Sequence, residues 1–144
     1  MAYNAERVVQ TLKLNYDKIT FDVKVKERSL YVTADLSING LDDSVYFNVE
    51  LFENKVVIIE FVFDKLDKTL RSYELINKFN EESYFLKASI TTRGENDDDY
   101  LRIAAKVMNA VDEDNAYDNI DFALGQIFDD DLFPIIKDLC ALTY

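Results

Sequence analysis

The chain has no histidine and only one cysteine among its 144 residues. Histidine is the usual general base of enzymes and the commonest transition-metal ligand, so its absence removes Ser–His and Cys–His nucleophile pairs and most metal centres. The single cysteine, Cys140, cannot form a disulfide within the chain. It lies in an apolar stretch with helical character, where a thiol is usually buried and inert.

Glycine and proline are also scarce, at three and one residues. We therefore expect regular elements joined by short turns, and no glycine-rich loop is present to bind a phosphate. The longest uncharged apolar run, Val56 to Ile59, is far too short for a membrane helix. No signal-peptide pattern begins at Met1, so we expect one domain, residues 1–144, located in the cytoplasm.

Basic residues are outnumbered, with 16 Lys and Arg against 28 Asp and Glu, a net charge of -12. Nucleic acids and anionic membranes are bound through Lys and Arg, so we predict that the chain binds neither directly. Residues 1–28 hold 6 basic and 4 acidic side chains, a charge of +2, and the remaining residues therefore carry -14. The acidic surface belongs to the later elements.

Hydrophobic periodicity predicts a helix over residues 5–15 and then a series of strands. Alternation of apolar and polar residues predicts three strands, over residues 19–25, 30–36 and 45–51, and a mainly apolar segment predicts a fourth over residues 56–63. The last of these is apolar on both faces except at Glu60, which indicates either a central strand covered twice or a contact surface.

The second half of the chain predicts more helices and two strands. A helix capped by Asp64 or Asp67 should run to Asn80, with its apolar face formed by Leu66, Leu70, Tyr73 and Ile76. Strands are predicted over residues 84–92 and 100–109, although the second of these segments also suits a helix.

Helical spacing resumes at Asp114, and a second helical piece should begin near Asp131, because Pro134 is tolerated only in a first turn. The sequence therefore predicts an α+β fold of order α-ββββ-α-ββ-α(α). Runs of strands separated by single helices favour an antiparallel sheet with helices packed on it.

Clustered carboxylates are the remaining candidates for chemistry. Residues 112–115 resemble the start of a calcium loop, but Ala116 and Tyr117 stand where an EF-hand needs a ligand and a glycine. The clusters at residues 97–99 and 129–131 lie at predicted turns and helix starts, where Asp binds free backbone amides. Paired carboxylates could act as in glycosidases. We nevertheless predict no metal, no cofactor and no enzymatic activity.

Three acidic residues form a stripe on the predicted later helix: Asp114, Asp118 and Asp121. Spacings of four and three residues place them on one helix face, about 5 to 6 Å apart. This arrangement roughly resembles the successive phosphates of a nucleic-acid strand, but such a stripe is more often an ordinary solvated helix face.

The outward positions of the predicted sheet are rich in aromatic and aliphatic side chains. We predict that a partner or a second copy of the chain binds there, through Tyr31, Tyr46, Ile58, Val62 and Tyr100. Tyrosine is favoured at interfaces because its ring buries apolar area while its hydroxyl stays wet. The alternative is that a helix of the same domain covers this face.

Residues 73–80, followed by residues 84–88, resemble the YbjN-like family of bacterial sensory-transduction regulators. There, a helix with a Leu-x-x-x-Asn-like end leads directly into a strand. The resemblance continues through an acidic turn, a strand at residues 101–107 and a long helix with a late Phe133-Pro134 pair, and covers about residues 66 to 140.

This resemblance implies the fold of the type III secretion chaperones, which are small acidic proteins that commonly dimerise and bind polypeptides without catalysis. Four strands are predicted before the middle helix, where the family pattern has three, and no family site residue matches this chain. We therefore expect a non-enzymatic protein-binding module, chaperone-like or regulatory. The alternative is an acidic phage-type inhibitor that mimics nucleic acid and blocks a nucleic-acid-binding or defence protein.

Overall fold

The structure is a computed structural model that describes residues 4–110 and 112–144. It is an α+β fold, and its elements follow the predicted order. The helices are α1 (Ala5–Asn15), α2 (Leu70–Glu82), α3 (Glu113–Ile127) and α4 (Phe133–Leu142). The strands are β1 (Asp22–Val25), β2 (Ser29–Leu36), β3 (Val45–Phe52), β4 (Val57–Lys65), β5 (Lys87–Arg93) and β6 (Asp98–Val107). The ambiguous segment at residues 100–109 is thus a strand, as predicted, although the strand ends at Val107.

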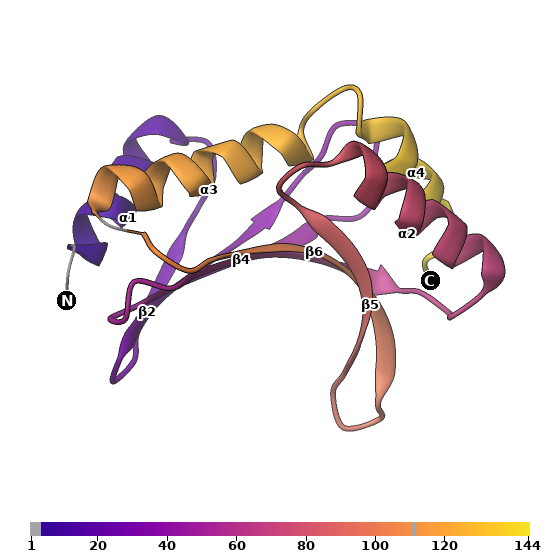
Figure 1. The fold of residues 1–144 in the computed structure, drawn as a ribbon, viewed down its shortest axis with the longest axis horizontal. Helices are drawn as coiled ribbons and strands as arrows, with labels where there is room; N and C mark the ends of the chain where they lie inside the picture. The colour runs from indigo at the N-terminus through magenta and orange to yellow at the C-terminus, as the bar shows by residue number, and fades with distance from the viewer. Residues whose placement is uncertain (1–3, 111) are drawn as a thin grey trace.

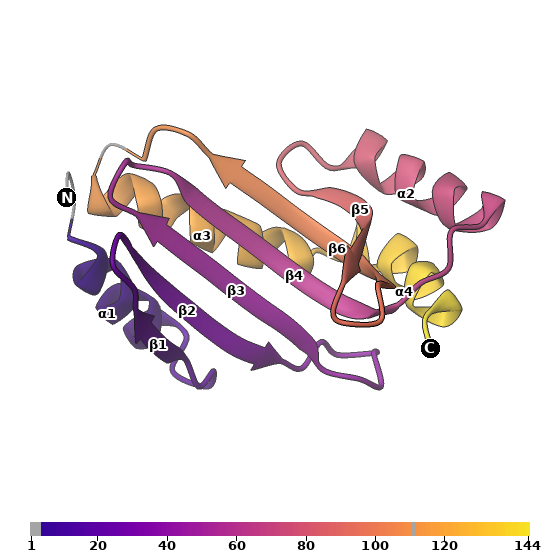
Figure 2. The same cartoon turned by 90° about the horizontal axis from the view of Figure 1, so that it is seen from below.

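The six strands form one antiparallel sheet in the order β1-β2-β3-β4-β6-β5. Figure 1 shows that the sheet is arched and that all four helices lie on its convex side. The β5–β6 hairpin bends away from the helices, so the opposite side of the sheet is concave. Figure 2 looks onto this concave side, which we call the open face.

The core fills the space between the sheet and the helices. Alternate side chains of the central strands point into it, and Phe47 and Phe61 are both 0% exposed, with ring centroids 5.2 Å apart. The helices contribute buried residues such as Leu12, Phe79 and Leu124 to the same continuous cluster. Each such side chain stabilises the fold by about 1.5–3 kcal/mol through burial.

The predicted start of α2 is wrong. Its N-cap is Thr69, whose hydroxyl oxygen accepts a hydrogen bond from the Ser72 amide at 3.1 Å. Asp64 still belongs to β4, because a register shift after Val62 lets that strand pair with β6 as far as Lys65. Asp67 instead accepts a hydrogen bond from the Tyr144 hydroxyl at 2.9 Å.

The predicted apolar face of α2 is wrong for the same reason. Leu66 is buried but precedes the helix, and Leu70 and Tyr73 are exposed. Once the helix begins at Leu70, the residues that face the core are Ser72, Leu75, Ile76 and Phe79. Only Ile76 belongs to both the predicted and the observed buried face.

Two strands are shorter than predicted at their first residues. β5 begins at Lys87 rather than Tyr84, which is 95% exposed, because residues 83–86 form the connection from α2. β1 begins at Asp22 rather than Ile19, although Phe21 is buried against Phe47 just before it. In both cases, apolar side chains in the preceding connection gave a sequence pattern that resembled the start of a strand.

Candidate functional site

The open face carries all five side chains predicted to contact a partner. By strand alternation they point away from the helices, since their neighbours along each strand fill the core. The pairing places Tyr46 opposite Val62, and Tyr31 and Ile58 on either side of Glu50. Tyr100 lies on β6, opposite Thr91. Because the four helices all pack on the convex side, they do not cover these residues (Figure 2).

Tyr31 occupies a crowded position on the open face. The Lys26 ammonium lies 4.2 Å above the centre of its ring, a cation–π arrangement. Burial, followed by the neighbouring Tyr46 and the charge of Glu60, raises the pKa of Tyr31 to about 12. Its hydroxyl therefore remains protonated at neutral pH and can donate a hydrogen bond.

An ion cluster lies at the centre of the open face. Glu60 of β4 is only 6% exposed, and its Oε2 accepts hydrogen bonds from Arg102 Nε at 2.6 Å and Arg93 Nη2 at 2.8 Å. Its Oε1 accepts a third hydrogen bond, at 2.5 Å, from Asn48 on β3. Residues of β3, β4, β5 and β6 thus meet at one carboxylate.

The electrostatics of this cluster favour the ionised acid. Burial alone would raise the pKa of Glu60, but the Arg102 hydrogen bond and the charges of Arg93 and Arg102 outweigh burial and lower the pKa. Both arginines remain partly exposed, with side chains 38% and 29% accessible.

Sequence reasoning found only one member of this cluster. Glu60 was visible as the single polar interruption of an apolar strand. Arg93 was assigned to a turn, and Arg102 lay in a segment of ambiguous structure. Asn48 gave no signal, because its position opposite Glu60 depends on the register between β3 and β4.

The acidic stripe lies on the opposite side of the molecule, on α3. Asp114, Asp118 and Asp121 are all exposed. Asp121, however, accepts a hydrogen bond from the hydroxyl of Tyr16, the residue that follows α1. Asp121 therefore connects the end of α1 to α3, whereas the side chains of Asp114 and Asp118 form no ion pair or hydrogen bond with another described residue.

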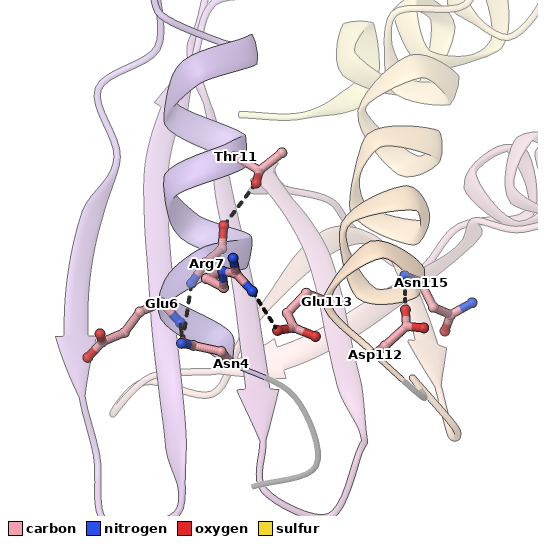
Figure 3. A network of polar contacts seen from close by, with 7 residues as sticks. All are labelled: Asn4, Glu6, Arg7, Thr11, Asp112, Glu113 and Asn115. Carbon is pink, nitrogen blue, oxygen red and sulfur yellow. Dashed lines mark hydrogen bonds and ion pairs between the residues drawn. The ribbon is translucent and has the colours of Figure 1, made fainter.

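The start of α3 differs from the prediction. The helix begins at Glu113, one residue before the predicted Asp114, and Asp112 caps it, because the Asp112 Oδ1 accepts a hydrogen bond from the Asn115 amide at 2.8 Å (Figure 3). Next to it, Glu113 pairs with Arg7 of α1 at 3.8 Å (Figure 3). These residues begin a helix and do not fold as a calcium loop.

Charge is divided unevenly between the two sides of the molecule. Residues 112–136 contain eight acidic and no basic residues, so α3 and its connection to α4 carry -8 of the net -12. The open face has six basic side chains (Lys24, Lys26, Lys65, Arg93, Arg102 and Lys106) and five acidic ones (Asp22, Asp35, Glu50, Glu60 and Asp98), apart from Lys87, which bonds back to α2. The open face is therefore close to neutral.

Cys140 and the remaining carboxylates form no metal centre. Within residues 4–110 and 112–144, no group of three or more His, Cys, Asp or Glu side chains is arranged to hold a metal ion. Cys140 lies partly buried on α4, where burial, then the charges of Asp64 and Asp43, raise the pKa of its thiol to about 12. The thiol is therefore neutral near pH 7.

None of the helices in the described part of the chain is long and apolar enough to cross a membrane. No protein-family model matches the chain, and no curated protein matches it at a significant level. The resemblance to the YbjN-like family stays a prediction from the sequence.

Proposed function

We propose that the chain is a non-enzymatic protein-binding module, chaperone-like or regulatory, and that its polypeptide partner binds the open face. The observation that carries this proposal is that all four helices pack on one side of the sheet while the other side presents Tyr31, Tyr46, Ile58 and Val62. Uncovered aromatic and aliphatic side chains of this kind are typical of interfaces.

The composition of the open face suits a protein better than a nucleic acid or a membrane. Tyrosine and arginine are the residue types that most often dominate the binding energy of protein interfaces, and the face contains both. Its six basic side chains are nearly matched by five acidic ones, so it offers little excess positive charge for phosphates. We expect the chain to bind its partner in the cytoplasm.

Two tyrosines of similar exposure provide a matched test. Tyr46 on the open face is 40% exposed and Tyr73 on α2 is 45% exposed. In a pull-down analysed by mass spectrometry, Tyr73→Lys should retain the partners of the unaltered chain, and Tyr46→Lys should lose them. Circular dichroism checks that both variants are folded. Retention of all partners by Tyr46→Lys, or equal loss from both variants, would contradict binding at the open face.

The second candidate is an acidic inhibitor that mimics nucleic acid. It is favoured by the charge of -8 over residues 112–136 and by the exposure of Asp114 and Asp118 on α3. A partner that reads these charges would contribute Lys or Arg, and its affinity would fall steeply as salt is added.

The test of this candidate leaves Asp121 unchanged, because its bond to Tyr16 connects α3 to the end of α1. Asp114→Asn with Asp118→Asn should weaken binding to a captured partner at low salt. The control is Glu81→Gln with Glu82→Gln, which removes the same charge from exposed positions on α2. If the two double variants bind equally well, charge mimicry by α3 is excluded.

A further inference from the structure

The two edges of the sheet differ in whether another part of the chain hydrogen-bonds to them. At the β5 edge, the Asn80 side chain accepts a hydrogen bond from the Ala88 amide at 2.6 Å and donates one to the Ala88 carbonyl at 3.1 Å. These are the two bonds that a neighbouring strand would make. Lys87 also donates to the carbonyls of Asn80 and Ser83 at the end of α2. The beginning of this edge is therefore closed by the chain itself.

The β1 edge is open. All four residues of β1 are exposed. The Lys26 amide donates a hydrogen bond to the Ser29 carbonyl across the β1–β2 hairpin. In an antiparallel ladder, hydrogen-bonded and non-hydrogen-bonded pairs alternate, so the backbone amides and carbonyls of Val23 and Val25 point away from β2. No other group in the described chain bonds to them. Their side chains are 41% and 76% exposed, so α1 leaves the helix side of this strand uncovered.

The sequence of this edge is complementary to itself. When a second β1 is laid antiparallel about a two-fold axis at Val23, Asp22 of each copy lies opposite Lys24 of the other. On the helix side, Val23 meets the second Val23, and Phe21 meets Val25. Opposite charges and apolar pairs directly across an antiparallel ladder both stabilise it. Proline and a β-bulge, two devices that block pairing at a sheet edge, are both absent from β1.

We propose that two copies of this chain pair through β1, centred on Val23. The outward amide and carbonyl of Val23 bond those of the second Val23, and the two sheets join into one of twelve strands. The axis is perpendicular to the sheet, so both helix layers lie on one side and both open faces lie on the other. The pairing thus leaves Tyr31 and Tyr46 free, and it stands or falls independently of the proposed function.

Cysteine cross-linking tests the register, in a Cys140→Ser background that has no other thiol. Opposed residues of a bonded pair have Cα atoms about 5.5 Å apart, within disulfide range. Val23→Cys should therefore oxidise to a covalent dimer. The control is Val25→Cys, where the two thiols are four positions apart, about 14 Å along the strand. Cross-linking at position 25, the more exposed site, that equals or exceeds that at position 23 would overturn the proposal.

Charge exchange tests the same pairing without cysteine. Asp22→Lys and Lys24→Asp should each raise the dimer dissociation constant on the order of tenfold, because two attractive cross-strand pairs become repulsive. A mixture of the two variants should form a heterodimer with the charges again opposed. Sedimentation equilibrium measures both. If the mixture associates no better than either variant alone, the register is wrong.

Proline at position 23 separates association from folding. Val23→Pro removes an outward amide that takes no part in the β1–β2 ladder, and proline is tolerated on edge strands in that orientation. The variant should be a folded monomer by circular dichroism and sedimentation. Association of Val23→Pro like that of the unaltered chain would overturn the proposal, as would an unaltered chain that sediments as a monomer at about 0.5 mM.

Discussion

Replacing Glu60 by glutamine tests whether the ion cluster stabilises the open face. The substitution keeps the shape of the side chain but removes the charge that accepts hydrogen bonds from Arg93 and Arg102. An amide can accept on only one side, so its NH2 group must face either an arginine or the Asn48 amide, both of which are donors. At least one donor in the cluster loses its partner.

The expected loss of stability follows from the exposure of the groups left behind. Removing one member of a buried ion pair costs about 3–5 kcal/mol. The side chains of Arg93 and Arg102 are 38% and 29% exposed, so water partly solvates them, and we expect a loss of about 2 kcal/mol. For a chain of 144 residues this lowers the midpoint of thermal unfolding by about 8 °C.

The loss of stability caused by Glu60→Gln should be larger near neutral pH than in acid. The pKa of Glu60 is lower in the folded state, so its ionised form stabilises the fold above the unfolded pKa, about 4.3, and this contribution is lost as pH falls through the folded pKa. Urea unfolding should therefore show the largest difference between Glu60→Gln and the unaltered chain near pH 7, and a smaller one below about pH 4. The control is Glu81→Gln, an exposed site. Equal stability at pH 7, or a gap that widens in acid, would refute the reasoning.

Two further comparisons test local structure by urea unfolding. Gly40→Ala should lower the free energy of unfolding by about 2 kcal/mol, because Gly40 has φ +95 and an added Cβ would lie 2.6 Å from Phe133 Cζ. Gly94→Ala, at φ +82 with nothing within 4 Å of an added Cβ, should lower it by about 1 kcal/mol. Equal losses would show that the Phe133 ring moves aside freely. Asp112→Ala should lose about 1 kcal/mol as the cap of α3, and Asp114→Ala should lose less; the reverse order would contradict the assigned cap.

The order of elements could be predicted because burial on one face leaves a strong local pattern. β2 and β3 alternate apolar and polar residues, and the segments predicted as turns are polar. The start of α2 could not be predicted in the same way. Asp64, Asp67 and Thr69 are all able to cap a helix, and the choice among them depends on how far β4 pairs with β6, a long-range interaction.

The candidate site was predictable to the extent that it follows alternation. Tyr31 and Tyr46 could be placed on the outward side of their strands, but no local pattern shows which side the helices cover. The cluster around Glu60 depends on register. Arg93 reaches Glu60 because the β5–β6 hairpin continues pairing to Arg93 and Asp98, beyond the last apolar residue of β5, where the sequence reads as a polar turn.

Because the open face is nearly neutral and α3 is strongly acidic, the salt dependence of binding can show which side of the molecule a partner contacts before any residue is changed. A partner on the open face covers side chains whose charges nearly cancel, so its affinity should vary little with salt. A partner on α3 approaches the eight acidic residues of positions 112–136, and long-range attraction then supplies much of its rate of association. Binding that weakens severalfold between low and moderate salt therefore assigns the contact to the helix layer. Binding that does not change assigns it to the sheet.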